Sequence, residues 1–73
     1  MAQEIIESPL PGKITSVNVK VGDQVGEGDV LCMLESMKME NPILSPVAGR
    51  VSEINVTADK TVDAGAVLAI IEY

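Results

Sequence analysis

One lysine in the chain has a setting that could support chemistry. Residues 35–41 read ESMKMEN, so that Lys38 lies between Met37 and Met39. Only five of the 73 residues are Lys or Arg, and the formal net charge is −6 at pH 7. A lysine amine is protonated at that pH and becomes a nucleophile only when another group removes its proton. Because the unbranched thioethers beside it can adapt to different surfaces, this stretch indicates a lysine that is presented to other proteins.

Catalysis by the chain itself is not expected. The sequence has no His and one cysteine, Cys32, which excludes a Ser-His or Cys-His pair, a zinc cluster and an internal disulfide. Cys32 lies within the apolar run VLCML, which predicts a small buried side chain. The eleven carboxylates are scattered, without a metal cluster to organise them. We therefore expect no catalytic residue and no metal site.

The composition also argues against several kinds of partner. Tyr73 is the only aromatic residue, so stacking on bases is not available, and a net charge of −6 repels nucleic acids and anionic membranes. No apolar run approaches the roughly 18 residues of a membrane span, and the start MAQEIIES lacks the features of a signal peptide. We expect no nucleic-acid partner, no direct membrane insertion and a cytoplasmic location.

The chain contains two copies of one unit. Residues 8–35 (SPLPGKITSVNVKVGDQVGEGDVLCMLE) align without a gap on residues 45–72 (SPVAGRVSEINVTADKTVDAGAVLAIIE), at an offset of 37. Ten of the 28 aligned positions are identical, including Gly12 with Gly49 and Gly28 with Gly65. We expect one domain over residues 1–73, in which residues 36–44 join the two repeats.

The pattern within each copy is typical of short strands. β-Branched residues alternate in part in KITSVNVKV and RVSEINVTA, and the apolar runs DVLCML and AVLAII follow a turn region. The pattern predicts strands over residues 3–8, 13–19, 24–25, 29–36, 39–44, 50–56, 61–62 and 66–72, with no helix. Two equal half-folds, each with an apolar face, would pack around a pseudo-two-fold axis as a small antiparallel sandwich.

Lys38 falls within the segment that joins the repeats. If the flanking strands form a two-residue hairpin, Met37 and Lys38 are its central residues, and a type I′ turn requires φ > 0 at both. The same register sets Glu35 opposite Glu40, a like-charge pair that is mildly unfavourable. Neither feature favours stability, and such departures from local preference concentrate at functional sites.

The stretch ESMKME resembles the biotinylation motif of biotin carboxyl carrier domains. The segments SPLPGKI and SPVAGRV on either side are similar to that family as well, so the likeness covers nearly the whole chain. It implies a flattened β-barrel or sandwich of two four-stranded antiparallel sheets, with the biotinyl-lysine on an exposed hairpin opposite the termini. The "thumb" insertion of one bacterial acetyl-CoA carboxylase carrier is missing from VNVKVGDQVGEGDV, so the chain is more similar to thumbless carriers.

The resemblance assigns roles to the residues of the motif. Lys38 would carry biotin, and Met37 and Met39 would be recognised by biotin protein ligase and by the carboxylase partners. Ser36 replaces the commoner Ala and keeps a small side chain. The remaining recognition residues would be the acids that flank the motif, Glu35 and Glu40. The domain would be a non-catalytic carrier between biotin carboxylase and carboxyltransferase or decarboxylase sites.

Two alternatives remain open from the sequence. A lipoyl carrier domain resembles the same fold and also modifies a hairpin lysine, but its usual motif is Asp-Lys-Ala, whereas Met37 and Met39 flank the lysine here. An unmodified sandwich module for protein interaction would leave the MKM sequence unexplained.

Overall fold

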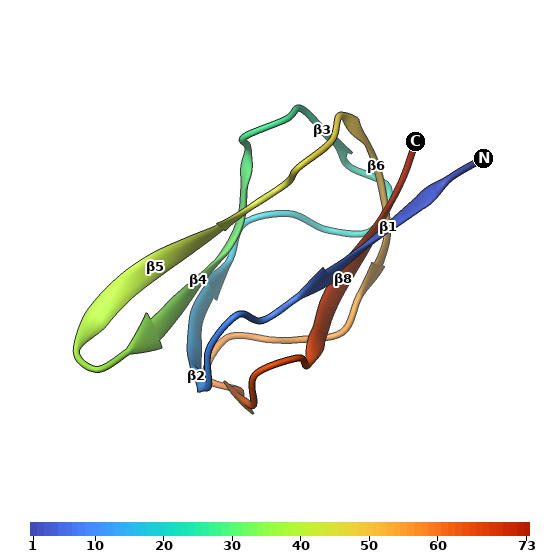
Figure 1. Cartoon of the computed structure of the whole chain (residues 1–73). Coiled ribbons are helices and arrows are strands. Elements are labelled where there is room, and N and C mark those ends of the chain that lie inside the picture. The colour runs from blue at the N-terminus through green and yellow to red at the C-terminus, as the bar shows by residue number, and fades with distance from the viewer.

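The computed structural model describes residues 1–73 and contains eight β-strands and no helix (Figure 1). The all-β prediction is confirmed. The strands are β1 (Gln3–Glu7), β2 (Gly12–Val17), β3 (Gln24–Val25), β4 (Val30–Ser36), β5 (Met39–Leu44), β6 (Gly49–Ile54), β7 (Thr61–Val62) and β8 (Val67–Glu72).

The predicted strands differ from the observed ones only at their ends, by one or two residues. β1 stops before Ser8, whose hydroxyl turns to donate a hydrogen bond to the Leu10 carbonyl at 2.6 Å. β2 and β6 begin one residue early, at Gly12 and Gly49. A Cβ at either glycine would collide with a backbone carbonyl of the neighbouring strand, so the closeness of the strands there requires glycine.

The strands form two four-stranded antiparallel sheets with equivalent topology. One sheet has the order β1-β8-β6-β3 and the other the order β5-β4-β2-β7. Adding 37 to the residue numbers carries β1 onto β5, β2 onto β6, β3 onto β7 and β4 onto β8, so one sheet maps strand by strand onto the other. The predicted sandwich with internal pseudo-two-fold symmetry is therefore confirmed.

Equivalent contacts in the two halves extend the strand pairing within each sheet. The Ser8 amide donates to the Ala66 carbonyl at 2.9 Å, and the Ser45 amide donates to the Asp29 carbonyl at 2.8 Å. Gly28 and Gly65 have φ of 90° and 86°, and no heavy atom lies within 4 Å of where a Cβ would be. These two glycines are therefore required by backbone conformation and not by lack of space.

A single apolar core lies between the sheets. Both repeats supply it with aliphatic side chains, and Cys32 and Ala69 complete it; its members are Ile6, Ile14, Val25, Leu31, Cys32, Leu34, Ile43, Val51, Val56, Val62, Leu68, Ala69 and Ile71. Burial raises the pKa of the Cys32 thiol, because the thiolate would lose its hydration. The prediction that Cys32 is a small buried side chain is confirmed.

The molecule is elongated, with extents of 36 × 18 × 17 Å. The two termini lie together at one end, where Ala2 and Tyr73 exchange backbone hydrogen bonds of 2.9 and 3.0 Å, and the β4–β5 hairpin forms the other end (Figure 1). Under the offset of 37, Ser36 at the end of β4 corresponds to Tyr73 at the end of the chain. The hairpin turn of one half is therefore equivalent in position to the chain termini of the other half. The turn and the termini therefore lie at opposite ends of the molecule (Figure 1).

Candidate functional site

The candidate site is the turn between β4 and β5. Ser36 pairs with Met39, so Met37 and Lys38 are the two central residues of the hairpin. Their φ angles are 54° and 63°, as the predicted type I′ turn requires. Because side chains with a Cβ disfavour this left-handed region, the turn is held by the pairing of the flanking strands and not by the preference of its own residues.

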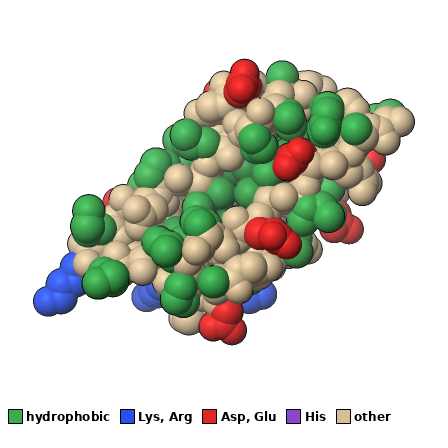
Figure 2. Space-filling view, in the orientation of Figure 1, with side chains coloured by type: hydrophobic (Ala, Val, Ile, Leu, Met, Phe, Trp, Pro, Cys, Tyr) green, Lys and Arg blue, Asp and Glu red, His purple; other side chains and the backbone are tan.

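The side chains of the turn project into solvent. Met37 is 93% exposed and Met39 is 67% exposed, so neither methionine belongs to the core. Lys38 is exposed and makes no ion pair and no side-chain hydrogen bond. In Figure 2 a basic side chain projects at the end of the molecule where β4 and β5 meet, with apolar side chains beside it. The turn therefore presents a free amine between two flexible apolar groups.

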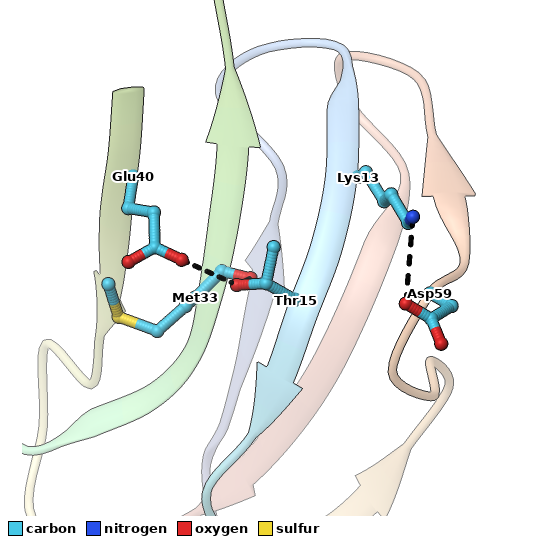
Figure 3. A network of polar contacts seen from close by, with 5 residues as sticks. All are labelled: Lys13, Thr15, Met33, Glu40 and Asp59. Atoms are coloured by element: carbon cyan, nitrogen blue, oxygen red, sulfur yellow. Dashed lines mark hydrogen bonds and ion pairs between the residues drawn. The ribbon is translucent and has the colours of Figure 1, made fainter. Parts of the chain in front are cut away.

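The acids that precede and follow the turn lie opposite each other, as predicted. Glu35 pairs with Glu40 in the β4–β5 register. The Thr15 hydroxyl of β2 lies 3.2 Å from Glu40 Oε1 and 3.5 Å from the Met33 carbonyl (Figure 3). It can donate to only one of them, and the nearer, charged carboxylate is the stronger acceptor. The contact turns the Glu40 carboxylate across β4 toward β2.

The contact of Thr15 with Glu40 is a feature that the sequence did not reveal. Thr15 lies at a β-bulge, where the β2–β4 register shifts between Ile14 and Ser16. Because Ile14 faces the core, strand alternation turns the Thr15 hydroxyl to the outer face of the sheet, beside Glu40 (Figure 3). The partial alternation in KITSVNVKV was the only sequence signal of this irregularity.

The other lysines lie away from the turn. Lys13 is opposite Glu35 in register but pairs with Asp59, at 3.6 Å (Figure 3). Lys60 donates to the Asn55 carbonyl at 3.4 Å, and Lys20 lies in the loop that follows β2. Lys38 is thus the one lysine that combines exposure, absence of a partner and a place at the end of the molecule.

A family model described as "Biotin-requiring enzyme" (Biotin_lipoyl) matches residues 4–71. The chain belongs to this family. As a biotin carboxyl carrier domain it has biotin as its cofactor, as the resemblance of the MKM stretch implied. The unmodified interaction module is therefore set aside.

The proteins with matching segments include a decarboxylase subunit and a carboxylase chain. The carrier domain is 62% identical over 39 residues to the gamma subunit of glutaconyl-CoA decarboxylase from Acidaminococcus fermentans, covering 53% of the chain and 27% of that subunit. It is 49% identical over 37 residues to the mitochondrial propionyl-CoA carboxylase alpha chain of Homo sapiens, covering 51% of the chain and 5% of that protein. The chain thus spans a small part of these relatives.

The fold comparison agrees with the sequence comparison. The crystal structure of Kluyveromyces lactis urea carboxylase contains a region that superposes with a TM-score of 0.91 at 29% identity, covering 99% of the carrier domain and 6% of that chain. The carrier domain contains no helix that could span a membrane.

Lys38→Ala is expected to change the free energy of unfolding of the carrier domain by no more than about 0.5 kcal/mol, because the side chain has no partner to lose. Lys38→Gly is expected to stabilise it by about 0.5 to 1 kcal/mol, since glycine accepts a φ of 63° without strain. Urea denaturation measures both changes. A loss above about 2 kcal/mol for Lys38→Ala would make the lysine part of the structural framework.

Proposed function

We propose that Lys38 is the biotin attachment site and that the domain is a carrier that performs no catalysis of its own. The observation that supports this most strongly is the free, exposed amine on a left-handed turn at the end opposite the termini. Asn-Gly would form a more stable type I′ turn than Met-Lys. A functional need for the lysine explains why the less stable pair is present.

The chemistry required of this chain is limited. Biotin protein ligase would bring biotin with its carboxyl group activated, and a ligase base would take a proton from the Lys38 ammonium. Nζ then attacks the activated carboxyl carbon, the activating group leaves with its bonding electrons, and the nitrogen gives up a second proton to solvent as the amide forms. The domain contributes the position of Nζ and the absence of a competing ion pair.

The modified lysine would act as a tether. The attached group supplies a ureido nitrogen that can accept and release carboxylate. Amide formation removes the positive charge of Lys38, so the formal net charge changes from −6 to −7. A tether of this kind replaces free diffusion by a high effective concentration at each of two active sites.

The proposed partners are biotin protein ligase, a biotin carboxylase, and a carboxyltransferase or decarboxylase. The relatives described above, one a decarboxylase subunit and the other a carboxylase chain, support this set. We propose that residues 1–73 act as one carrier domain within such an assembly. A cytoplasmic location fits the single, unpaired Cys32, since a reducing compartment does not favour disulfides.

The carrier function is tested by carboxylation of the biotinylated domain. The purified domain, after treatment with ligase and biotin, is incubated with a biotin carboxylase, ATP and radiolabelled bicarbonate. We expect label in the protein fraction, and none with domain that was not treated with ligase. Equal labelling of both samples would contradict the proposal, as would a biotinylated domain that takes up no label from any carboxylase of the relatives' classes.

Replacing both Met37 and Met39 by Leu is expected to leave biotinylation intact and to slow carboxyl transfer severalfold. Leucine keeps the apolar volume but loses the unbranched flexibility with which methionine fits different partners. Initial rates of transfer in the reconstituted complex measure the effect. Met33→Leu is the matched control, because Met33 is half-buried on β4 and away from the turn. Equal rates for the double variant and the wild type would leave no recognition role for the methionines.

A further inference from the structure

A groove on the flank of the molecule has no role in the proposed function. It lies between β1 and β5, each an edge strand of its own sheet, and has a volume of about 320 Å³. Figure 2 shows apolar side chains gathered in the hollow across this face, with acidic side chains beside them. No residue of the Met37–Lys38 turn lines the groove. Whatever covers it can therefore bind without occupying the turn.

The two repeats supply equivalent residues to the groove. Under the offset of 37, Ile6 corresponds to Ile43 and Pro9 to Pro46. Ile6 and Ile43 are 6% and 7% exposed and form the floor, where the groove reaches the core. The groove therefore lies along the pseudo-two-fold axis, and an extended apolar segment could cross it.

The β1 side and the β5 side of the groove do not carry equivalent residues at their rims. This difference indicates which kind of segment would bind there. Glu7 on the β1 side corresponds to Leu44 on the β5 side, and Glu4 corresponds to Asn41. Neither Glu4 nor Glu7 forms an ion pair within the chain. One rim is thus acidic and the other apolar, so the complementary segment carries basic side chains on one side and aliphatic side chains on the other.

The two edge strands also differ in their capacity to pair with an added strand. Pro42 lies within β5 and has no N–H to donate, which blunts that edge for strand pairing. β1 contains no proline, so its outer edge is the one that can pair with an added strand. A second copy of this chain is a poor occupant, because it brings a net charge of −6 to an acidic rim.

We propose that the groove docks an extended segment of a partner protein in which lysine or arginine alternates with aliphatic residues. Its aliphatic side chains, on the face turned to the core, cover Ile6 and Ile43, and its basic side chains, on the outer face, meet Glu7. Ile5 and Leu44, at 53% and 47% exposed, lie on the outer faces of the two edge strands, beside the segment. Held by its flank in this way, the domain keeps Lys38 free to enter an active site.

The test is a titration of the isotope-labelled chain, followed by amide NMR, with a short capped peptide that alternates lysine and valine. We expect saturable shifts confined to β1, β5 and the residues that follow them, and a Kd that rises with salt. A peptide with glutamate in place of lysine should bind at least about tenfold more weakly, because its charges meet a like-charged rim. Shifts that do not saturate, or that centre on the Met37–Lys38 turn, would overturn the proposal.

Substitutions inside and outside the groove distinguish peptide binding at the groove from binding at other apolar surfaces. Ile5→Lys is expected to abolish peptide binding, whereas Val21→Lys, at a position 60% exposed and outside the groove, should leave Kd unchanged. Changing Glu4 and Glu7 together to Gln should weaken binding about three- to tenfold. Equal Kd values for Ile5→Lys and Val21→Lys would refute the docking surface, as would a peptide-free chain that dimerises through this face in sedimentation equilibrium.

The proposal is separable from biotin attachment. Lys38→Arg should bind the peptide with the wild-type Kd, although it cannot be biotinylated. A change of more than about threefold in Kd for Lys38→Arg would mean that the turn belongs to the binding surface, and the groove proposal would fail while the attachment proposal stood.

Discussion

Val62→Asp is expected to unfold the domain at room temperature or to bring it close to unfolding. Val62 is 5% exposed, lies opposite Gly12 in the β2–β7 pair and belongs to an entirely apolar core. A carboxylate at this position has no partner, and its burial costs at least about 3 kcal/mol. For 73 residues the total stability is roughly 4 to 11 kcal/mol. The free energy of unfolding from urea denaturation measures the loss.

Thr61→Asp is the matched control for this change. Thr61 lies in the same two-residue strand but is exposed, so the same charge there should change stability by about 0.5 kcal/mol or less. The pseudo-two-fold axis extends the prediction to the equivalent pair, since Val25 is 7% exposed and Gln24 is exposed. Similar losses for Val62→Asp and Thr61→Asp would show that the core does not extend to β7.

Lys38→Arg is expected to abolish biotin labelling completely while the fold is kept. Arginine retains the positive charge and the length of the side chain, but its guanidinium stays protonated and is not acylated under conditions that acylate an amine. The turn tolerates the change, because the side chain has no contact to lose. A streptavidin blot after treatment with ligase and biotin measures the labelling, and circular dichroism checks the fold.

The remaining lysines provide the controls for this variant. Lys13→Arg, Lys20→Arg and Lys60→Arg should each leave labelling at the wild-type level, since none of these lysines lies on the turn between two methionines. Full labelling of Lys38→Arg, or a strong reduction in any of the other three variants, would place the attachment site elsewhere.

The sequence was sufficient to predict the fold because the structure repeats where the sequence repeats. The offset of 37 brought Gly12 into line with Gly49 and Gly28 with Gly65, and these positions have matched backbone roles. The apolar runs in each copy fixed which strands face the core. The strand ends expected at Ser36 and Met39 also predicted a two-residue turn of Met37 and Lys38, and Ser36 pairs with Met39 in the structure.

Features that depend on distant parts of the chain were not predictable in the same way. Thr15 meets Glu40 across β4, beside a bulge that shifts the register of β2, and partial alternation does not say where a bulge falls. The groove depends on the approach of β1 and β5, which belong to different sheets and do not pair. Only their symmetry relation, which carries Ile6 onto Ile43, could have suggested it.

The central claim is that one lysine of this chain carries biotin, and an intact mass followed by peptide mapping tests it most directly. The whole chain is produced together with a biotin protein ligase and supplied with biotin. We predict a mass increase of one biotinyl group and a modified peptide in which the group is on Lys38. An unchanged mass, the mass of a lipoyl group, or a biotinyl group on Lys13, Lys20 or Lys60 would contradict the account.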